Sequence, residues 1–341
     1  MAKQNLLGKN LAELQEICSL EGLSRFAPKQ IADWLYVKRV RSIDDMTNIS
    51  KSHRSILSQK YDIVYLPIEK VAKSSDGTKK YLFPVHTNSC VETVMIPDDD
   101  RSTICVSSQA GCRMGCKFCM TGRQGFKGNL DSGEIISQFL SIDESDILTN
   151  AVFMGMGEPL DNIENVFKAI EILTSEWGFA WSPKRITVST IGVNVKKLLD
   201  FTKVHLAVSM HNPFPQERLE MMPCEHSNPL DQTIKLIKKY DFKGQRRVSF
   251  EYIMFDGLND TKRHADAIVQ KLKGLECRVN LIRFHDIKDT KFKSSPEFVI
   301  EKFRERLNNA GITTTIRASK GEDISAACGM LSGKINKELN I

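Results

Sequence analysis

The sequence has no long uninterrupted hydrophobic run and only a small excess of charge. Its apolar stretches are a handful of residues long, far short of the roughly 20 residues that span a bilayer. Residues 1–10 also lack the continuous apolar core of a signal peptide. The net charge of +6 over 341 residues is too small to identify a nucleic-acid partner by itself. We therefore expect a globular protein of the cytoplasm with no membrane-spanning helix.

Structural disulfides are not expected either, although the chain contains nine cysteines. Their number is odd, the chain is long, and a reducing compartment keeps thiols free. Metal or redox chemistry is therefore the leading explanation for at least some of these cysteines. With 41% hydrophobic and 26% charged residues, the remaining composition is that of an ordinary globular protein with a sizeable core.

Residues 1–60 have helical periodicity and carry most of the excess positive charge. Asn10 is placed to cap a helix over Leu11–Leu20, and Pro28 suits the first turn of a second helix. The segment holds ten Lys and Arg residues against six Asp and Glu residues. This charge forms either a solvated helical face or a docking surface for phosphates. We expect a helical accessory domain over residues 1–60.

Beyond this segment the patterns change from helical to β-like and then alternate. Tyr81–Val85 and Val91–Ile96 predict a β linker sheet within residues 61–100. Residues 101–310 contain six alternations of strand-like and helix-like segments, which imply parallel strands with right-handed crossovers. The fold class is therefore α/β, an open partial (β/α)6 barrel, with a C-terminal strand and tail over residues 311–341.

The predicted barrel strands are short apolar runs, and the predicted helices between them have helical periodicity. The strands are Thr103–Ser107, Ala151–Met154, Arg185–Ser189, His205–Ser209, Ser249–Met254 and Val279–Phe284. The helices are Gly133–Ser141, Asn162–Ser175, Val193–Phe201, Leu230–Lys239, His264–Leu272 and Pro296–Asn309.

Three cysteines stand close together directly after the first predicted barrel strand. Cys112, Cys116 and Cys119 have the spacing Cys-x3-Cys-x2-Cys on a loop that contains glycine. Zinc sites usually take four ligands as two separated pairs, and no fourth ligand stands at a matching distance here. Soft thiolates suit iron–sulfur clusters. Three ligands on a four-iron cluster leave one iron open to bind a substrate.

This motif, with Phe118 just before its last cysteine, resembles the radical S-adenosylmethionine superfamily. The resemblance implies a [4Fe-4S] cluster on the three cysteines, with the amino and carboxylate groups of S-adenosyl-L-methionine (SAM) on the fourth iron. It also implies reductive cleavage of SAM to a 5′-deoxyadenosyl radical. A zinc knuckle is the alternative explanation of the three cysteines.

Candidate SAM contacts follow the later strands, where a barrel places its ligand groups. Gly157 and Glu158 follow the second predicted strand; glycine lets the backbone approach a ligand, and a carboxylate accepts hydrogen bonds from an amino group. This stretch resembles the superfamily's methionine-binding strand end. The further candidates at the ends of later strands are Ser189, Ser209, Met210, His211 and His285.

Four stretches narrow the resemblance: CVSSQAGC at residues 105–112, TGRQGFKGNL at 121–130, FMGMGEPL at 153–160 and GEDISAACG at 321–329. Together they resemble the RlmN/Cfr family of radical methyltransferases, which act on an adenosine of 23S ribosomal RNA. The family fold is a partial (β/α)6 radical-SAM barrel with an N-terminal helical domain, which we expect to dock the RNA.

The resemblance also assigns roles to three residues outside the cluster motif. Cys328 would receive a methyl group from SAM, and a second SAM would supply the radical that activates this methyl group for addition to the adenine ring. Cys105 would then release the product by forming a transient disulfide with Cys328. Glu92 matches the family's proposed base for removing the ring proton. Cys18, Cys90, Cys224 and Cys277 have no motif around them and are expected to be packing residues.

The chain departs from the family pattern at two places. His285-Asp286 stands where the family commonly has Asn-Pro, whose Asn contacts SAM, so His285 takes the position of that contact. Pro223-Cys224-Glu225 stands where Pro-Ile-Asn is usual. Phe126 and the residues before Cys328 are more like the group that methylates carbon 2 of adenine; methylation of carbon 8, as in the antibiotic-resistance branch, is the alternative.

The expected partners are 23S rRNA, with a tRNA adenosine as a possible second substrate, and a low-potential electron donor such as flavodoxin or ferredoxin. A monomer is the simplest expectation. Three other functions compete with this interpretation. They are a plain redox protein with four cluster ligands, a zinc-stabilised RNA-binding module, and a radical SAM enzyme with a non-RNA substrate.

Overall fold

The centre of the molecule is one large sheet, shown in a computed structural model that describes residues 3–243, 248–287 and 289–332. Over these residues the sheet has ten strands in the order β14-β13-β12-β11-β10-β9-β6-β5-β4-β3. Its parallel part consists of β6 (Arg101–Cys105), β9 (Asn150–Phe153), β10 (Ile186–Thr190), β11 (His205–Ser209), β12 (Val248–Met254), β13 (Arg278–Arg283) and β14 (Thr313–Ile316). The six predicted barrel strands are confirmed.

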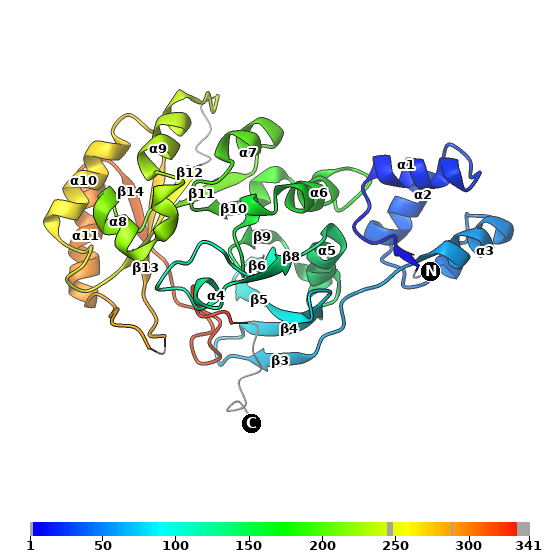
Figure 1. Ribbon diagram of the computed structural model, residues 1–341, viewed down its shortest axis with the longest axis horizontal. Coiled ribbons are helices and arrows are strands. Elements are labelled where there is room, and N and C mark those ends of the chain that lie inside the picture. The colour runs from blue at the N-terminus through cyan, green and yellow to red at the C-terminus, as the bar shows by residue number, and fades with distance from the viewer. Residues whose placement is uncertain (1–2, 244–247, 288, 333–341) are drawn as a thin grey trace.

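Helices connect the parallel strands and line the sheet from its middle to its far end (Figure 1). They are α5 (Ser132–Leu140), α6 (Ile163–Thr174), α7 (Val195–Phe201), α8 (Pro215–Met221), α9 (Leu230–Lys239), α10 (Lys262–Leu272) and α11 (Glu297–Asn309). Neighbouring helices α5 and α6, α9 and α10, and α10 and α11 contact each other. The six predicted helices are confirmed, whereas the short helix α8 was not predicted.

The β-like stretches before the barrel extend the main sheet instead of forming a sheet of their own. They are β3 (Lys70–Lys73), β4 (Lys79–Val85) and β5 (Ser89–Asp98), which run antiparallel to one another. β5 also pairs antiparallel with β6, for example Val94 with Cys105. This pairing satisfies backbone groups that β6 would otherwise expose at the edge of the parallel part.

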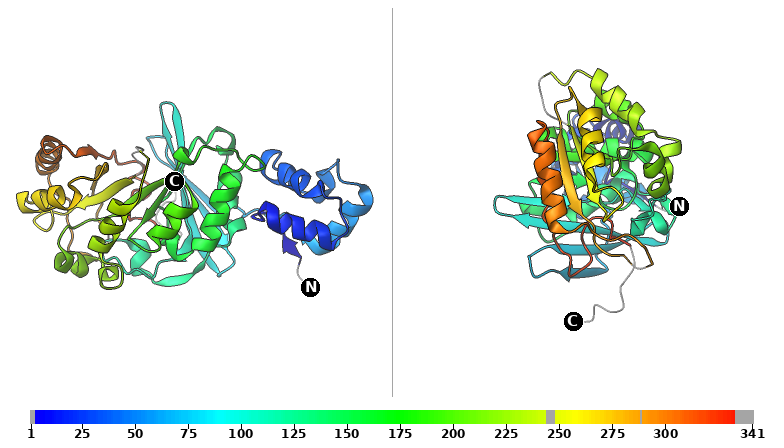
Figure 2. Two further views of the ribbon diagram at one scale, coloured as in Figure 1. Left: turned by 90° about the horizontal axis from the view of Figure 1, so that it is seen from above. Right: turned by 90° about the vertical axis from the view of Figure 1, so that its left-hand side faces the viewer.

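The N-terminal helices lie at one end of the elongated molecule (Figures 1 and 2). They are α1 (Leu11–Leu20), α2 (Ala27–Ala32) and α3 (Lys51–Lys60), and the strands β1 (Gln4–Asn5) and β2 (Tyr61–Asp62) pair beside them. Asn10 caps α1 in a capping box with Glu13, as its position in the sequence predicted. Glu13 also accepts a hydrogen bond of 2.8 Å from Lys168 on α6, so the capping residues bind this end to the barrel.

A smaller hairpin-like unit lies over the edge of the sheet. It consists of β7 (Gln109–Gly111), α4 (Met120–Arg123) and β8 (Phe126–Asn129), with β7 and β8 antiparallel. The loop between β7 and α4 packs on a second apolar core that is separate from the main one and includes Phe118, Met222 and Phe255. Among the described residues, no helix is long and apolar enough to cross a membrane.

Candidate active site

The three cysteines of the motif lie on the loop between β7 and α4. Cys112 and Cys116 are buried and Cys119 is partly exposed. The backbone N–H of Cys119 donates to the carbonyl of Cys116 at 3.2 Å, and that of Cys112 donates to the carbonyl of Gly125 at 3.1 Å. Gly111 begins the loop with φ +71, and a Cβ there would lie 1.9 Å from the Gly125 carbonyl oxygen. Only glycine fits this close approach.

The donor set fits a multi-iron cluster better than a single ion. The three thiols lie close enough for each to affect the charge of the others. Burial raises the pKa of Cys112 to about 12, so thiolates here require a nearby cation, which a metal centre supplies. Among the His, Cys, Asp and Glu residues that the structure describes, one group has three ligand atoms within 4.8 Å of each other, and it does not include the three cysteines. At least two of the three cysteine sulfurs therefore lie more than 4.8 Å apart, which suits a multi-iron cluster better than one ion.

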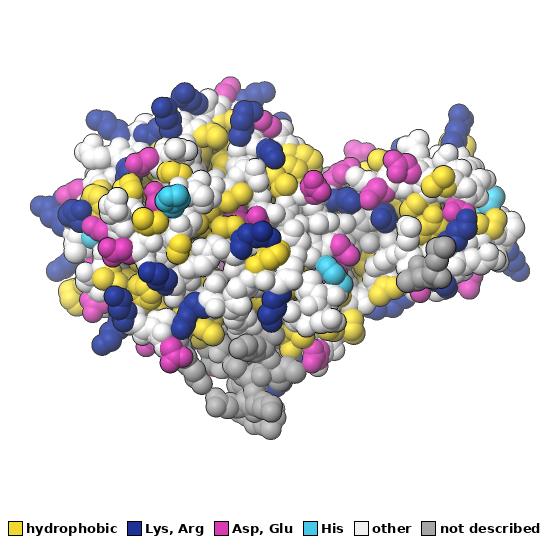
Figure 3. All heavy atoms as spheres, in the orientation of Figure 1, with side chains coloured by type: hydrophobic (Ala, Val, Ile, Leu, Met, Phe, Trp, Pro, Cys, Tyr) yellow, Lys and Arg dark blue, Asp and Glu magenta, His cyan; other side chains and the backbone are white. Residues whose placement is uncertain are grey.

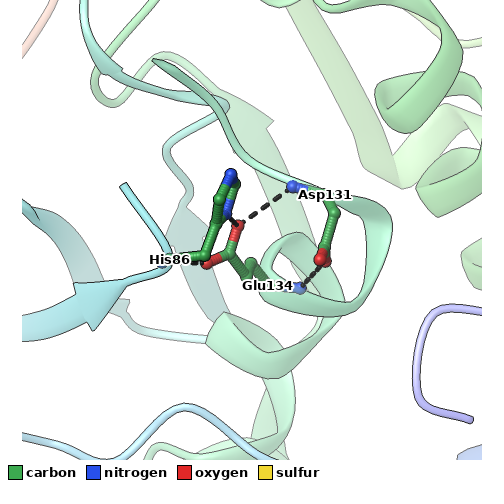
Figure 4. A group of neighbouring side chains, drawn as sticks. All are labelled: His86, Asp131 and Glu134. Atoms are coloured by element: carbon green, nitrogen blue, oxygen red, sulfur yellow. Dashed lines mark hydrogen bonds and ion pairs between the residues drawn. The ribbon is translucent and has the colours of Figure 1, made fainter. Parts of the chain in front are cut away.

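That other group, His86, Asp131 and Glu134, is explained by helix capping (Figure 4). Asp131 is the N-cap of α5 and forms a capping box with Glu134. His86 adds two contacts, because its backbone N–H and its ring nitrogen Nδ1 lie 2.7 and 2.8 Å from the Glu134 carboxylate. These contacts attach the end of β4 to the start of α5, and they use the carboxylate oxygens that an ion would need.

Gly157 and Glu158 lie at the carboxyl end of β9, beside the cluster loop. Gly157 has φ +100, and a Cβ there would lie 2.5 Å from the Cβ of Gln109. The buried carboxylate of Glu158 accepts hydrogen bonds from the backbone N–H groups of Leu160 at 3.2 Å and Ile191 at 3.0 Å. Burial raises the pKa of Glu158 to about 7 despite these bonds. Glu158 therefore joins the ends of β9 and β10 at the same edge of the sheet.

Three more candidate SAM contacts lie on the neighbouring strands at the same edge. Ser189 is in β10 and Ser209 ends β11, and both are partly exposed, whereas Met210 is buried. The backbone carbonyls of Ser209 and Met210 accept hydrogen bonds of 2.8 and 2.9 Å from Arg218. Arg218 is fully buried, so its guanidinium fixes the backbone of this strand end. The sequence did not reveal this supporting residue.

His211 connects this strand end with the cluster loop. Its ring nitrogen Nδ1 accepts a hydrogen bond of 3.1 Å from the backbone N–H of Ile253, which follows in β12. Its ring lies edge-on to Phe118, with 5.1 Å between the ring centroids. Burial, assisted by the positive charge of Arg218, lowers the pKa of His211 to about 3. The ring is therefore neutral and Nδ1 is an acceptor.

The C-terminal tail is attached near residue 321 to the β3–β4 hairpin. The backbone N–H of Gly321 donates to the Asp76 carboxylate at 3.0 Å. The backbone N–H of Ser75 donates to Asp323 at 3.1 Å. Glu322, between these points, lies 3.2 Å from Nδ1 of His285. His285 follows β13, so in this structure it contacts the tail.

A few residues later the same tail contacts the start of α4, directly after the cluster loop. The backbone N–H of Met120 donates to the carbonyl of Gly329 at 2.8 Å, and the hydroxyl of Thr121 donates to the carbonyl of Leu331 at 2.7 Å. Cys328 lies between the attachment at residues 321–323 and the attachment at residues 329–331, and it keeps an exposed surface. Its charge interacts with that of Cys119, so Cys328 lies beside the three-cysteine loop.

Cys328 and Cys105 lie near one another and near the partly exposed Arg317. Cys105 ends β6, and burial raises its pKa to about 12. Desolvation by the surrounding protein also raises the pKa of the Cys328 thiol, although the residue keeps an exposed surface. Arg317 follows β14, and its positive charge opposes both shifts by favouring the thiolates. Its Nε lies 3.1 Å from the Glu251 carboxylate, which holds the guanidinium in place.

Glu92 lies on β5 against the tail. Its side chain is 3% exposed, and its carboxylate lies 3.0 Å from Nζ of Lys80 and accepts a 2.6 Å hydrogen bond from the backbone N–H of Ser332. Nζ of Lys80 also donates to the carbonyl of Ser325 at 3.2 Å. Lys80, which the sequence motifs did not indicate, therefore connects the predicted base with the tail that carries Cys328.

The basic side chains of the cluster loop are partly neutralised. Nε of Arg113 lies 2.9 Å from Asp161, and its guanidinium lies 3.8 Å from the centroid of the Phe126 ring. Lys117 and Arg123 line a cavity of about 620 Å³ that is also lined by acidic Glu217, Glu220 and Asp289. On the face shown in Figure 3, the described Lys and Arg side chains are likewise interspersed with Asp and Glu. The positive charge around this cavity is therefore partly offset by acidic side chains.

Two family models match the chain. Residues 106–268 match the model described as the Radical SAM superfamily. Residues 4–63 match the model described as the Ribosomal RNA large subunit methyltransferase N-terminal domain. The first match contains the cysteine loop and the strand ends described above, and the second contains the N-terminal helices.

Individual relatives and a solved structure match over almost the whole length. The chain is 55% identical over 328 residues to the probable dual-specificity RNA methyltransferase RlmN of Porphyromonas gingivalis, covering 96% of each chain. It is 51% identical over 343 residues to the protein of the same name from Bacteroides thetaiotaomicron, covering 100% of this chain and 99% of the relative. A crystal structure of a radical SAM methyltransferase from Sphaerobacter thermophilus matches with a TM-score of 0.90 and 36% identity, covering 97% and 100% of the two chains.

Proposed function

This chain belongs to the RlmN family of radical SAM RNA methyltransferases, and we propose that it methylates carbon 2 of an adenosine in 23S ribosomal RNA through a methyl group carried on Cys328. One observation carries this proposal. The tail is attached on both sides of Cys328, to the β3–β4 hairpin and to the start of α4 directly after the cluster loop, which supports a carrier thiol working between the cluster and an incoming base.

We assign the [4Fe-4S] cluster to Cys112, Cys116 and Cys119. When bound, the cluster and SAM supply the electron, the radical and the methyl group. Gly157 and Glu158 are assigned to the amino end of SAM, because glycine permits close approach and the Glu158 carboxylate lies at the strand edge beside the loop. The remaining SAM site is assigned to residues at the same edge, namely Ser189, Ser209, Met210, His211 and His285.

The thiol chemistry belongs to Cys328 and Cys105. The Cys328 thiolate takes the methyl group from the sulfonium of SAM, forming an S–CH3 bond as the sulfonium C–S bond breaks. This carbon would first lose a hydrogen atom to the SAM-derived radical and bond to the adenine ring, and the adduct would then give up one electron. The Cys105 thiolate then attacks the Cys328 sulfur, which forms a disulfide and breaks the bond from sulfur to the product carbon; that carbon keeps the bonding electron pair and takes up a proton to become the methyl group. A thiol reductant must then return two electrons to the disulfide before the next cycle. Arg317 stabilises both thiolates.

Glu92 is the proposed acceptor of the adenine ring proton. Its carboxylate is buried beside the tail and close to the ammonium group of Lys80, and a carboxylate positioned at the substrate can act as a general base. The target base must leave its stack to reach a site at this depth. We propose that the N-terminal helical domain docks the RNA through phosphates, so binding weakens as salt rises.

The partners follow from this chemistry. An enzyme of ribosomal RNA works in the cytoplasm and needs a low-potential electron donor such as flavodoxin or ferredoxin. The names of the two relatives include dual specificity, and we extend this property to the present chain as a second, tRNA substrate. The protein is proposed to act as a monomer.

The test is mass spectrometry of nucleosides from 23S rRNA and tRNA, comparing a strain that lacks this protein with its complemented parent. We expect 2-methyladenosine to disappear from both RNAs and to return on complementation. Appearance of 8-methyladenosine instead would assign the protein to carbon-8 methylation. No change in either nucleoside would contradict an RNA substrate.

A further inference from the structure

Cys224, which the sequence suggested was a packing residue, contacts a proposed cluster ligand. The thiols of Cys224 and Cys116 lie close enough to interact with each other. Both side chains are buried, with 5% and 9% exposure, in an apolar group that also contains Met222 and Phe255. This contact joins positions more than a hundred residues apart in the sequence, so neither local motif could predict it.

The backbone around both cysteines supports the contact. Cys224 lies in the short 3-10 helix Pro223–His226, directly after α8. The backbone N–H of Lys117, next to Cys116, donates to the carbonyl of Met221 at 3.0 Å. The cluster loop therefore rests on the end of α8 and on the turn that carries Cys224.

A buried ion pair fixes that turn in place. Glu225 pairs with Arg218, which is 0% exposed, and its carboxylate also accepts a hydrogen bond of 3.1 Å from the backbone N–H of Leu230. Arg218 in turn holds the carbonyls at the end of β11. The Pro-Cys-Glu sequence therefore has two structural effects. Its glutamate anchors the turn, and its cysteine reaches the cluster loop.

We propose that Cys224 donates an S–H···S hydrogen bond to the iron-bound sulfur of Cys116 and thereby raises the reduction potential of the cluster. This inference rests on the proposed cluster site. A thiolate bound to iron has no proton, so Cys224 must be the donor. Hydrogen bonds to cluster sulfurs stabilise the more negative, reduced state, and this stabilisation sets the potential. The apolar surroundings strengthen the bond because little solvent competes for it.

The experiment is a redox titration of the reconstituted full-length protein, without RNA, followed by the electron paramagnetic resonance signal of the reduced cluster. Cys224→Ala removes the donor, and its midpoint potential should shift to a more negative value than that of the parent. Cys224→Ser keeps a donor, and its midpoint should stay at or above the parent value. Cys18→Ala is the matched control, because Cys18 is also a buried thiol but lies in α1 within the main core. Its midpoint should equal that of the parent.

Each outcome separates the role of Cys224 from the cluster assignment. If the Ala and Ser variants both keep the parent's midpoint, or both shift down together, Cys224 acts through packing and the proposal is wrong. If the Ala variant binds too little iron to be titrated, the Ser variant decides, and a midpoint below the parent's contradicts the proposal. A parent protein that assembles no cluster would instead overturn the proposed cluster site.

Discussion

The cluster loop, residues 112–119, and the tail, residues 321–331, meet at one site but are held in different ways. The loop directly follows Gly111, where a side chain would clash with the Gly125 carbonyl. It rests on a buried apolar core and on the end of α8. The tail is held at its two ends by individual hydrogen bonds, with Cys328 exposed between them. The difference matches their proposed tasks, because cluster ligands must keep one geometry, whereas a carrier thiol must meet two partners.

Removing one thiol from each region gives the largest expected effects. Cys116→Ala and Cys328→Ala should both reduce RNA methylation by at least about a thousandfold, because each removes a group that the chemistry requires. Only Cys116→Ala should also lose the iron and the brown colour of the reconstituted protein. Iron analysis with an RNA methylation assay checks both expectations. Activity in the Cys328→Ala variant, or full iron content in the Cys116→Ala variant, would contradict the division of tasks.

Arg317→Met tests how the carrier thiol is activated. Burial raises the pKa of Cys105 to about 12 and also raises that of Cys328, and Arg317 opposes both shifts. The thiolate is the reactive form, so the rate should rise with pH, and loss of the arginine should move the profile to higher pH. A further rise of about one pKa unit lowers the thiolate fraction about tenfold at neutral pH.

The measurement is the rate of Cys328 methylation against pH, followed by mass spectrometry. Arg306→Met is the matched control, because Arg306 pairs with Asp266 on the outer helices α11 and α10. Its profile should coincide with that of the parent. Arg317→Lys keeps the positive charge and should retain most of the rate that Arg317→Met loses; an equal loss of rate in both variants would mean that the arginine has only a structural role.

Asp76→Ala should loosen the tail while leaving the cluster loop intact. Asp76 accepts a hydrogen bond from the backbone N–H of Gly321, and a hydrogen bond contributes about 1 kcal/mol. Its loss should raise the detached population of the tail, and hence its rate of proteolytic cleavage, about fivefold. Limited proteolysis measures this rate, with exposed Asp99→Ala as the control. Unchanged cleavage would show that other contacts hold the tail.

The smallest effect is expected for the support beneath the loop. Although burial opposes it, hydrogen bonds from Arg263, His264 and Asn212 lower the pKa of Glu217, on α8, to about 2. A lowered acid pKa stabilises the fold above the unfolded value of about 4.3, and this stability is lost as pH falls toward 2.

Glu217→Gln should therefore lower the free energy of unfolding at neutral pH by less than about 1 kcal/mol, with a slightly lower melting temperature. The decline of stability below about pH 4.5 should be less steep in this variant than in the parent. Thermal unfolding at a series of pH values measures both quantities, with Glu220→Gln on the same helix as the control. A variant that declines as steeply as the parent would remove Glu217 from the support of the loop.

Much of the fold could be predicted because its signals are local. Buried parallel strands are short apolar runs, and the helices between them repeat their apolar residues at helical spacing. The helix Leu11–Leu20 was predicted with its observed bounds, and its start is marked by the capping residue Asn10. α8 has no such mark, and seven residues are too few to establish a period. The pairing of β5 with β6 depends on neighbours in space, which no local pattern encodes.

The site divides in the same way. The motif gave the three cysteines and the strand-end residues, because their spacing is itself the signal. Lys80, Arg317 and Cys224 each lie near a residue from a distant part of the chain, and no motif marks these pairs as neighbours. His285 was expected at SAM on the basis of its position, and the structure adds a contact with the tail residue Glu322. Such contacts appear only when the chain is folded.

The most direct measurement follows a heavy-isotope methyl group from SAM through one round of reaction. The reconstituted protein is incubated with labelled SAM and no RNA, and the peptide containing Cys328 is analysed by mass spectrometry before and after unlabelled SAM, a reductant and 23S rRNA are added. We expect the label on Cys328 first and then in 2-methyladenosine. Two results would contradict the carrier role of Cys328. In one, the label never reaches Cys328 although the rRNA becomes methylated; in the other, the rRNA is methylated without label while the label stays on Cys328.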